Sequence, residues 1–189
     1  MAYSPSVNRL TKDAIKALNT LQTNSDILSQ IAKSGGRLQQ TSLPEMREWL
    51  RRINYLPEDL NRLNIIHITG TKGKGSTCAF VTSLLQHLSP ERKIGLFTSP
   101  HLKSVNERIQ VNAKPIEENL FARYFWEVWD RLEESAEKEG LDGAVKPSYF
   151  RYLTLMAWHT FLDLKVRTFG ACIDLGRYGR NRSWSRWRI

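Results

Sequence analysis

One stretch of sequence decides the fold: Ile65-Ile66-His67-Ile68-Thr69-Gly70-Thr71-Lys72-Gly73-Lys74-Gly75-Ser76-Thr77. Its first residues form a short β-branched run, which favours a strand, and its glycines then turn the chain into a helical pattern. Glycines let backbone N–H groups approach a ligand, the first helical turn adds free N–H groups, and Lys74 adds a full charge. The stretch therefore predicts a phosphate-binding loop in a protein that handles a nucleoside triphosphate.

The spacing of this glycine loop, residues 70–77, differs from that of the standard P-loop. The standard motif reads G-x-x-x-x-G-K-S/T, whereas here Gly70 and Gly73 are closer together, as G-x-x-G-K-G-S/T. Many glycine-rich turns are purely structural, so the turn alone is weak evidence. The apolar run before it, its two lysines and the helix-compatible run 77–88 favour phosphate binding over a structural turn.

The composition is that of an ordinary globular protein. The chain has 189 residues, of which 41% are hydrophobic, enough for one domain with a core. No apolar stretch approaches the roughly 20 residues that span a bilayer, and residues 1–5 show neither a signal peptide nor a transit helix. Cys78 and Cys172 match no metal-binding spacing and are typical of a reduced, intracellular protein.

The net charge of +9 suggests nucleic-acid binding, but its distribution argues against that function. Residues 166–189 contain six arginines and one acid, Asp174, so the C-terminal segment alone supplies more than half of the excess charge. The remainder of the chain is not unusually basic.

The hydrophobic pattern predicts an α/β fold. We expect helices at residues 12–33, 43–53 (with Pro44 in the first turn), 77–88, 117–139 and 148–164, and strands at residues 63–69, 93–98 and 171–175. Residues 106–111 look extended, and residues 112–115 look like a turn.

A strand, glycine turn, helix and strand in this order open a doubly wound sheet. The strands at 63–69 and 93–98 should therefore be parallel neighbours, with their carboxyl ends facing the nucleotide. The aromatic residues between 121 and 129 are interpreted as helix packing rather than as a base-stacking platform.

Two further motifs add a family resemblance to the glycine loop. They are Gly95-Leu96-Phe97-Thr98-Ser99-Pro100-His101-Leu102 and Asn106-Glu107-Arg108-Ile109, with additional matches at residues 19–24 and 146–151. Over residues 19–166 the chain resembles the folylpolyglutamate synthases, which are Mur-ligase-like, ATP-dependent amide synthases, and Lys72 resembles the eukaryotic members. The resemblance implies the N-terminal part of a Mur-ligase-like P-loop domain, an α/β fold whose parallel sheet is flanked by helices and left incomplete.

The resemblance also implies a reaction. These enzymes use MgATP to phosphorylate the terminal carboxylate of a folate, and the amine of glutamate then attacks the acyl phosphate to give a γ-linked polyglutamate tail. Phosphorylation supplies a leaving group to a carboxylate, which is otherwise a poor electrophile. The implied cofactors are ATP and Mg²⁺, with a monovalent cation such as K⁺ as a further candidate, and the implied partners are folate and glutamate. We expect a monomer in the cytoplasm, with mitochondria as a second location, that binds no nucleic acid and spans no membrane.

Roles carry over to this sequence position by position. The implied ATP-binding residues are Gly70, Thr71, Lys72, Gly73, Lys74, Gly75, Ser76 and Thr77. Lys74 is the main catalytic charge, and Ser99 is the implied Mg²⁺ ligand. Pro100, His101 and Arg108 match the loop that borders the folate, although a solvated surface charge remains an equal alternative for Arg108. His67, His87 and His159 are interpreted as structural or surface residues.

The chain departs from the family after Leu164. The family pattern continues with a strand that ends in a metal-binding glutamate, then a glycine-rich loop and a metal-binding histidine. Here Asp174 is the only candidate for the glutamate position, and residues 177–189 resemble nothing in the family. We therefore expect a partial ATP-binding domain over residues 1–165, a disordered aberrant tail over residues 166–189, no C-terminal ligase domain, and no ligase activity of this chain.

Three other functions stay open from the sequence. A dihydrofolate synthase shares the same glycine loop. A nucleotide-binding fragment without turnover would bind MgATP and form no product. A basic nucleic-acid-binding module would use the arginines and tryptophans of residues 177–189 to neutralise phosphates and stack on bases.

Overall fold

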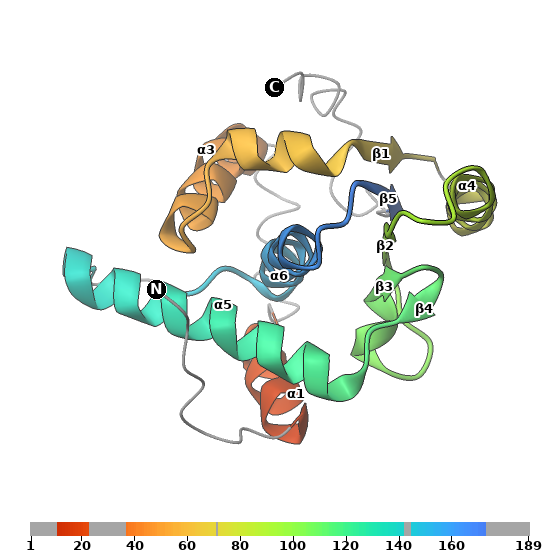
Figure 1. Ribbon diagram of the computed structural model, residues 1–189. Helices are drawn as coiled ribbons and strands as arrows, with labels where there is room; N and C mark the ends of the chain where they lie inside the picture. Colours follow the sequence, from red (N-terminus) through yellow and green to blue (C-terminus); the bar gives the residue numbers. More distant parts are fainter. Residues whose placement is uncertain (1–10, 23–36, 71, 142–144, 173–189) are drawn as a thin grey trace. The chain divides into compact units, whose positions relative to one another are not determined.

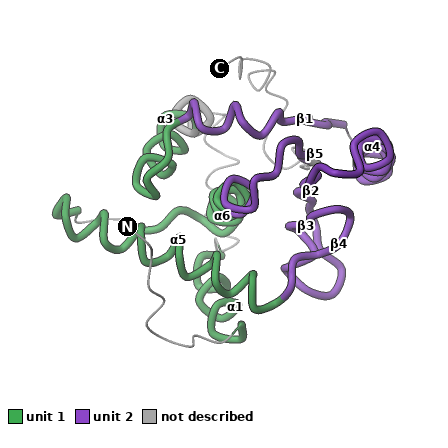
Figure 2. Tube along the Cα trace, viewed as in Figure 1, with its two compact units in different colours: residues 1–56, 118–159 green, residues 57–117, 160–189 purple. Residues whose placement is uncertain are grey.

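The structure, a computed structural model, describes residues 11–22, 37–70, 72–141 and 145–172. They fall into two compact units, which are coloured separately in Figure 2. Unit 1 comprises Met1–Leu56 with Glu118–His159, and unit 2 comprises Pro57–Glu117 with Thr160–Ile189. No helix in the described ranges combines the length and apolarity that a membrane crossing requires.

Unit 1 is helical. It contains α1 (Thr11–Thr20), α3 (Arg37–Arg52), α5 (Glu118–Glu139) and the first part of α6 (Tyr149–Asp163). One face of α5 is fully buried and repeats at helical spacing, with Phe121, Phe125, Val128 and Leu132 at 0% exposure. The ring of Phe125 lies 5.1 Å from that of Tyr152 on α6. The aromatic residues of α5 therefore serve helix packing, as the sequence predicted.

Two helix predictions need correction. The helix expected at residues 12–33 ends at Thr20, where α1 ends, and residues 23–33 lie outside the described ranges. The helix expected to begin near Leu43 begins at Arg37, so Pro44 lies inside α3 rather than in its first turn. A proline inside a helix removes one backbone hydrogen bond, and its ring crowds the carbonyl four residues earlier, so tertiary packing of the helix must offset this cost. Met46 and Leu50 of α3, which are 8% and 2% exposed, supply such packing.

His159 is a core residue, as expected from its apolar helix. Its imidazole is 2% exposed and lies between the Tyr55 hydroxyl, 2.9 Å from Nδ1, and the Glu127 carboxylate, 2.6 Å from Nε2. Both ring nitrogens are thus satisfied within unit 1, which explains how a polar ring is tolerated there.

Unit 2 is built on a five-stranded sheet in the order β1-β5-β2-β3-β4 (Figure 1). The strands are β1 (Ile65–Ile68), β2 (Ile94–Thr98), β3 (Ile109–Val111), β4 (Lys114–Pro115) and β5 (Thr168–Cys172). Helix α4 (Lys74–Leu88) packs on β5 and β2, and the short 3₁₀ helices η1 (Pro57–Leu63) and η2 (Val105–Arg108) join the other elements.

The order of the strands corrects the sequence prediction. β1 and β2 are parallel to each other, as expected, but they are not neighbours, because β5 lies between them and pairs with both in parallel. Gly95 on β2 makes this close fit possible. A Cβ atom there would come within 2.8 Å of Phe169 Cβ and 2.9 Å of the Phe161 ring. The third strand, expected at residues 171–175, therefore begins earlier, at Thr168, and lies second in the sheet, between β1 and β2.

The position of β5 also corrects the expected start of the tail at residue 166. Val166 and Phe169 are 2% and 1% exposed, and β5 is hydrogen-bonded on both sides. The ordered sheet thus extends to Cys172, while residues 173–189, including Asp174, lie outside the described ranges.

The sheet is mixed rather than purely parallel. β3 pairs antiparallel with β2, and β4 pairs antiparallel with β3. Asn112 and Ala113 form the two-residue turn, both with left-handed φ angles of 52° and 59°, as a tight hairpin requires. The expected turn at residues 112–115 is therefore confirmed at its first two positions. Residues 106–108, expected to be extended, form the 3₁₀ helix η2.

Candidate phosphate-binding site

The glycine loop and the loop after β2 leave the same edge of the sheet. Ile68 at the end of β1 and Thr98 at the end of β2 both pair with Cys172 of β5, so the two strands end level with each other. Neighbouring strands lie about 4.8 Å apart, which places these two ends about 10 Å apart across β5. The carboxyl ends of parallel strands are where open α/β sheets bind ligands.

The glycine loop enters α4 through a left-handed residue. Gly73 is the N-cap of α4, with φ 77° and ψ −6°, a conformation that residues with a side chain rarely adopt. The first hydrogen bond of the helix runs from the Thr77 N–H to the Gly73 carbonyl at 2.9 Å. The N–H groups of Gly75 and Ser76 precede this bond and, as in the first turn of any helix, have no acceptor within α4. The start of α4 therefore presents backbone donors and a positive dipole end to an anion.

Lys74 reaches back over the loop. Its Nζ donates a hydrogen bond of 2.7 Å to the carbonyl of Gly70, so the ammonium group lies beside the backbone of the loop. The Thr77 hydroxyl donates to the Gly73 carbonyl at 3.0 Å, which gives Thr77 a role in the helix start as well as its expected role in binding. Gly70, Lys72, Gly75 and Ser76 are exposed, whereas Thr71 lies outside the described residues. The structure thus places the Lys74 ammonium group close to the first turn of α4, on an accessible surface.

Helix α4 is anchored to the sheet by small residues. Cys78 is fully buried and packs with Leu96 of β2 and Ile68 of β1, and Thr82 one turn later is 1% exposed. The buried thiol acts here as a small apolar group. This contact fixes the first turns of α4, and with them the donors of the glycine loop, at the edge of the sheet.

Ser99 follows β2 directly and is half-buried. Its hydroxyl is a hard oxygen donor of the type that Mg²⁺ accepts, and Mg²⁺ usually takes few protein ligands besides phosphates and water. In the described part of the chain, no group of three or more His, Cys, Asp or Glu side chains is arranged to hold a metal. The fit to Mg²⁺ therefore rests on one protein ligand beside a triphosphate.

His101 and Arg108 come together, as a shared role requires. Arg108 Nε donates to His101 Nδ1 at 2.9 Å, and Arg108 is 8% exposed. The alternative interpretation of Arg108 as a solvated surface charge is therefore wrong. Burial, and next the positive charge of Arg108, lower the pKa of His101 below its ordinary value. The neutral ring, with Nδ1 accepting from Arg108, carries its proton on Nε2.

Glu107 holds this loop, and the sequence interpretation gave it no role. Its carboxylate accepts hydrogen bonds from three successive N–H groups, those of Leu102 at 2.8 Å and of Lys103 and Ser104 at 3.0 Å each. These bonds lower the pKa of Glu107, with that of Leu102 the largest cause. A sequence signal existed, because Ser104 and Glu107 have the spacing of a capping box, which the structure forms at η2.

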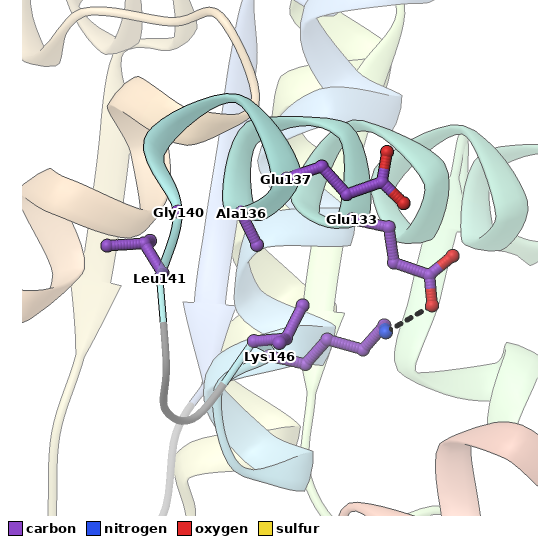
Figure 3. A pocket seen from close by; sticks show the side chains of 7 residues that line it. Glu133, Ala136, Glu137, Gly140, Leu141 and Lys146 are labelled. Carbon is purple, nitrogen blue, oxygen red and sulfur yellow. Dashed lines mark hydrogen bonds and ion pairs between the residues drawn. The ribbon is translucent and has the colours of Figure 1, made fainter.

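His67 and His87 lie outside both loops, on β1 and late in α4. His67 on β1 is half-buried, and burial lowers its pKa, whereas His87 late in α4 is exposed. Unit 1 has a hollow of about 370 Å³ near the end of α5, lined by Glu133, Glu137 and Lys146 among others (Figure 3). Lys146 is paired there with Glu133 at 2.6 Å. Two glutamates and one lysine make this hollow unsuited to a triphosphate.

Comparison with known proteins identifies relatives of this chain. No family model matches the chain. A probable folylpolyglutamate synthase of Schizosaccharomyces pombe is 52% identical over 169 residues, which cover 86% of this chain and 32% of that protein. The folylpolyglutamate synthase of Neurospora crassa is 54% identical over 161 residues, covering 82% of this chain and 30% of that protein. The chain is a homologue of the folylpolyglutamate synthases. It spans about a third of the length of the curated relatives it matches.

Solved folylpolyglutamate synthases share the fold. The enzyme of Lactobacillus casei matches with a TM-score of 0.67 at 20% identity, over 89% of this chain and 36% of that chain. The Mycobacterium tuberculosis enzyme complexed with ADP matches with a TM-score of 0.61 at 25% identity, over 85% of this chain and 31% of that chain. The expected α/β fold of a folylpolyglutamate synthase is thereby confirmed.

Proposed function

We propose that this chain binds the triphosphate of ATP at the glycine loop, as part of a ligase that adds glutamate to the γ-carboxylate of folate. The observation that carries the proposal is the start of α4. There the amides ahead of the first helical hydrogen bond and the Lys74 ammonium group lie together at the edge of the sheet. The relatives named folylpolyglutamate synthase support the same function.

In this function each residue has a physical task. The backbone at Gly73 turns the N–H groups of α4 toward the phosphates, and Lys74 exchanges the Gly70 carbonyl for a phosphate oxygen, so its charge offsets the negative charge there. Ser99 would hold Mg²⁺ through its hydroxyl, and the metal would neutralise further phosphate charge. A monovalent cation such as K⁺ stays a further candidate cofactor. His101 and Arg108 offer N–H donors that suit the carboxylates of folate.

Nucleotide titration of the purified chain tests the proposal. Calorimetry with ATP and Mg²⁺ should show one site, and Lys74→Ala should weaken it at least tenfold. A folded chain, by circular dichroism, that binds no ATP would contradict the proposal.

The ligase activity of this chain and its cellular location stay predictions. The expected absence of turnover is checked by incubating the chain with MgATP, folate and glutamate and looking for a lengthened product. Location in the cytoplasm, with mitochondria as a second site, is checked by imaging the tagged chain in cells.

A further inference from the structure

The loop of residues 99–108 is closed on itself by η2. Besides the three N–H groups that Glu107 binds through its carboxylate, the backbone carbonyl of Glu107 accepts from the Thr98 hydroxyl at 3.4 Å and from Gln110 Nε2 at 2.9 Å. Arg108, the next residue, reaches back to His101. Two adjacent residues of η2 thus bind both the beginning and the middle of the loop.

This closure leaves one apolar side chain in an unusual position. Leu102 is 93% exposed, although its own N–H donates to Glu107 at 2.8 Å. A flexible loop would let a leucine fold back onto the protein and bury its apolar surface, which is worth about 1.5–3 kcal/mol for a fully buried side chain. A backbone fixed at three successive amides keeps this side chain out in solvent. The loop is therefore held in a form that offers an apolar contact next to the His101–Arg108 pair.

We propose that Glu107 is a positioning residue: its carboxylate holds the 99–108 loop in the form that takes the folate substrate, with Leu102 as the apolar contact for an aromatic ring. The inference rests on the proposed function, since folate combines flat rings with anionic carboxylates. The exposed side chain of Leu102 suits a flat ring, and the N–H donors of the Arg108–His101 pair suit a carboxylate. Glu107 acts through the loop and itself touches neither nucleotide nor the reacting carboxylate.

Separate titrations of the full chain with ATP and with folic acid test this assignment. Glu107→Gln keeps the side-chain length but removes the charge that makes these hydrogen bonds strong, so folic acid affinity should fall about tenfold while ATP affinity stays unchanged. Glu91→Gln, on an exposed turn away from both loops, is the matched control and should change neither affinity. Amide hydrogen exchange should show lost protection at Leu102, Lys103 and Ser104 in Glu107→Gln and nowhere in α4.

Leu102→Ala decides the outcome if Glu107→Gln unfolds the chain, because an exposed side chain contributes little to stability. It should weaken folic acid binding severalfold, whereas Leu84→Ala, which removes an exposed leucine from α4, should not. Unchanged folic acid affinity in Leu102→Ala, or in a folded Glu107→Gln with deprotected amides, overturns the proposal, as does a wild-type chain that binds ATP but no folic acid. A chain that binds folic acid but no ATP would instead contradict the proposed nucleotide function. The folic acid titrations of the variants would still test the role of Glu107.

Discussion

In the glycine loop the backbone itself sets the shape, whereas in the 99–108 loop side chains hold the backbone in place. The glycine loop depends on the left-handed angle of Gly73 and on the start of α4, and its surface is exposed. The 99–108 loop depends on Glu107, whose carboxylate binds three amides, and on the buried Arg108. Both loops follow parallel strands that end level with Cys172. The glycine loop is thus shaped by one left-handed glycine and a helix start, while the 99–108 loop uses three of its own amides to hold itself closed.

Gly95→Ala should have the largest effect and should disturb both loops together. The new Cβ would lie within 3 Å of Phe169 and Phe161, which would push β5 away from β2 and cost about 3 kcal/mol of unfolding free energy. Urea denaturation followed by circular dichroism measures this loss. Gly170→Ala is the control, because its Cβ would meet only the flexible Leu96 side chain at 3.4 Å. Equal stability of the two variants would show that β5 is not tightly fitted against β2.

Lys74→Ala should separate the two loops by ligand. Removing a charged donor from the phosphates should cost about 2 kcal/mol of ATP binding energy, while folic acid binding and the exchange of the Leu102 amide stay unchanged. Calorimetry and hydrogen exchange measure the two effects. A loss of protection at Leu102 in this variant would mean that the two loops are coupled.

Gly73→Ala and Gly75→Ala should act in opposite directions on stability. Gly73 has φ 77°, so an alanine there should cost about 1–2 kcal/mol although its Cβ meets no atom within 4 Å. Gly75 lies in the first turn of α4, where alanine is favoured over glycine by about 0.5–1 kcal/mol. Thermal unfolding measures both changes. ATP binding should weaken in both variants, because an added methyl group at either position stands where phosphate approaches the backbone.

Acidification should loosen the 99–108 loop and leave the glycine loop intact. The amides of Leu102, Ser104 and Lys103 hold the pKa of Glu107 below its ordinary value of 4.5. A group with a lowered pKa in the folded state contributes its full stabilisation above the unfolded pKa and loses it as the pH falls through the folded pKa. Protection of these three amides from hydrogen exchange should therefore persist at pH 4.5 and above and decline below it. The Thr77 amide should keep its protection over the same range. Glu107→Gln should show no such acid step.

Much of the fold was predictable because it is encoded in local pattern. The β-branched run before Gly70 predicted β1, the helical spacing of apolar residues predicted α4, α5 and α6, and the glycines predicted the turn that leads into α4. These signals depend only on residues within a few positions of one another. The capping-box spacing of Ser104 and Glu107 was equally local, and it could have predicted the closure of the 99–108 loop.

The sequence by itself therefore determined β1, the turn at Gly73 and α4, since strand pattern, glycine conformation and helix pattern follow from short-range order. Only the tertiary structure decided that β5 lies between β1 and β2, because that depends on Gly95 leaving room for Phe161 and Phe169, residues far along the chain. It also decided that Arg108 is a buried partner of His101 rather than a solvated charge. Burial is a property of the whole fold, and no window of sequence around Arg108 contains it.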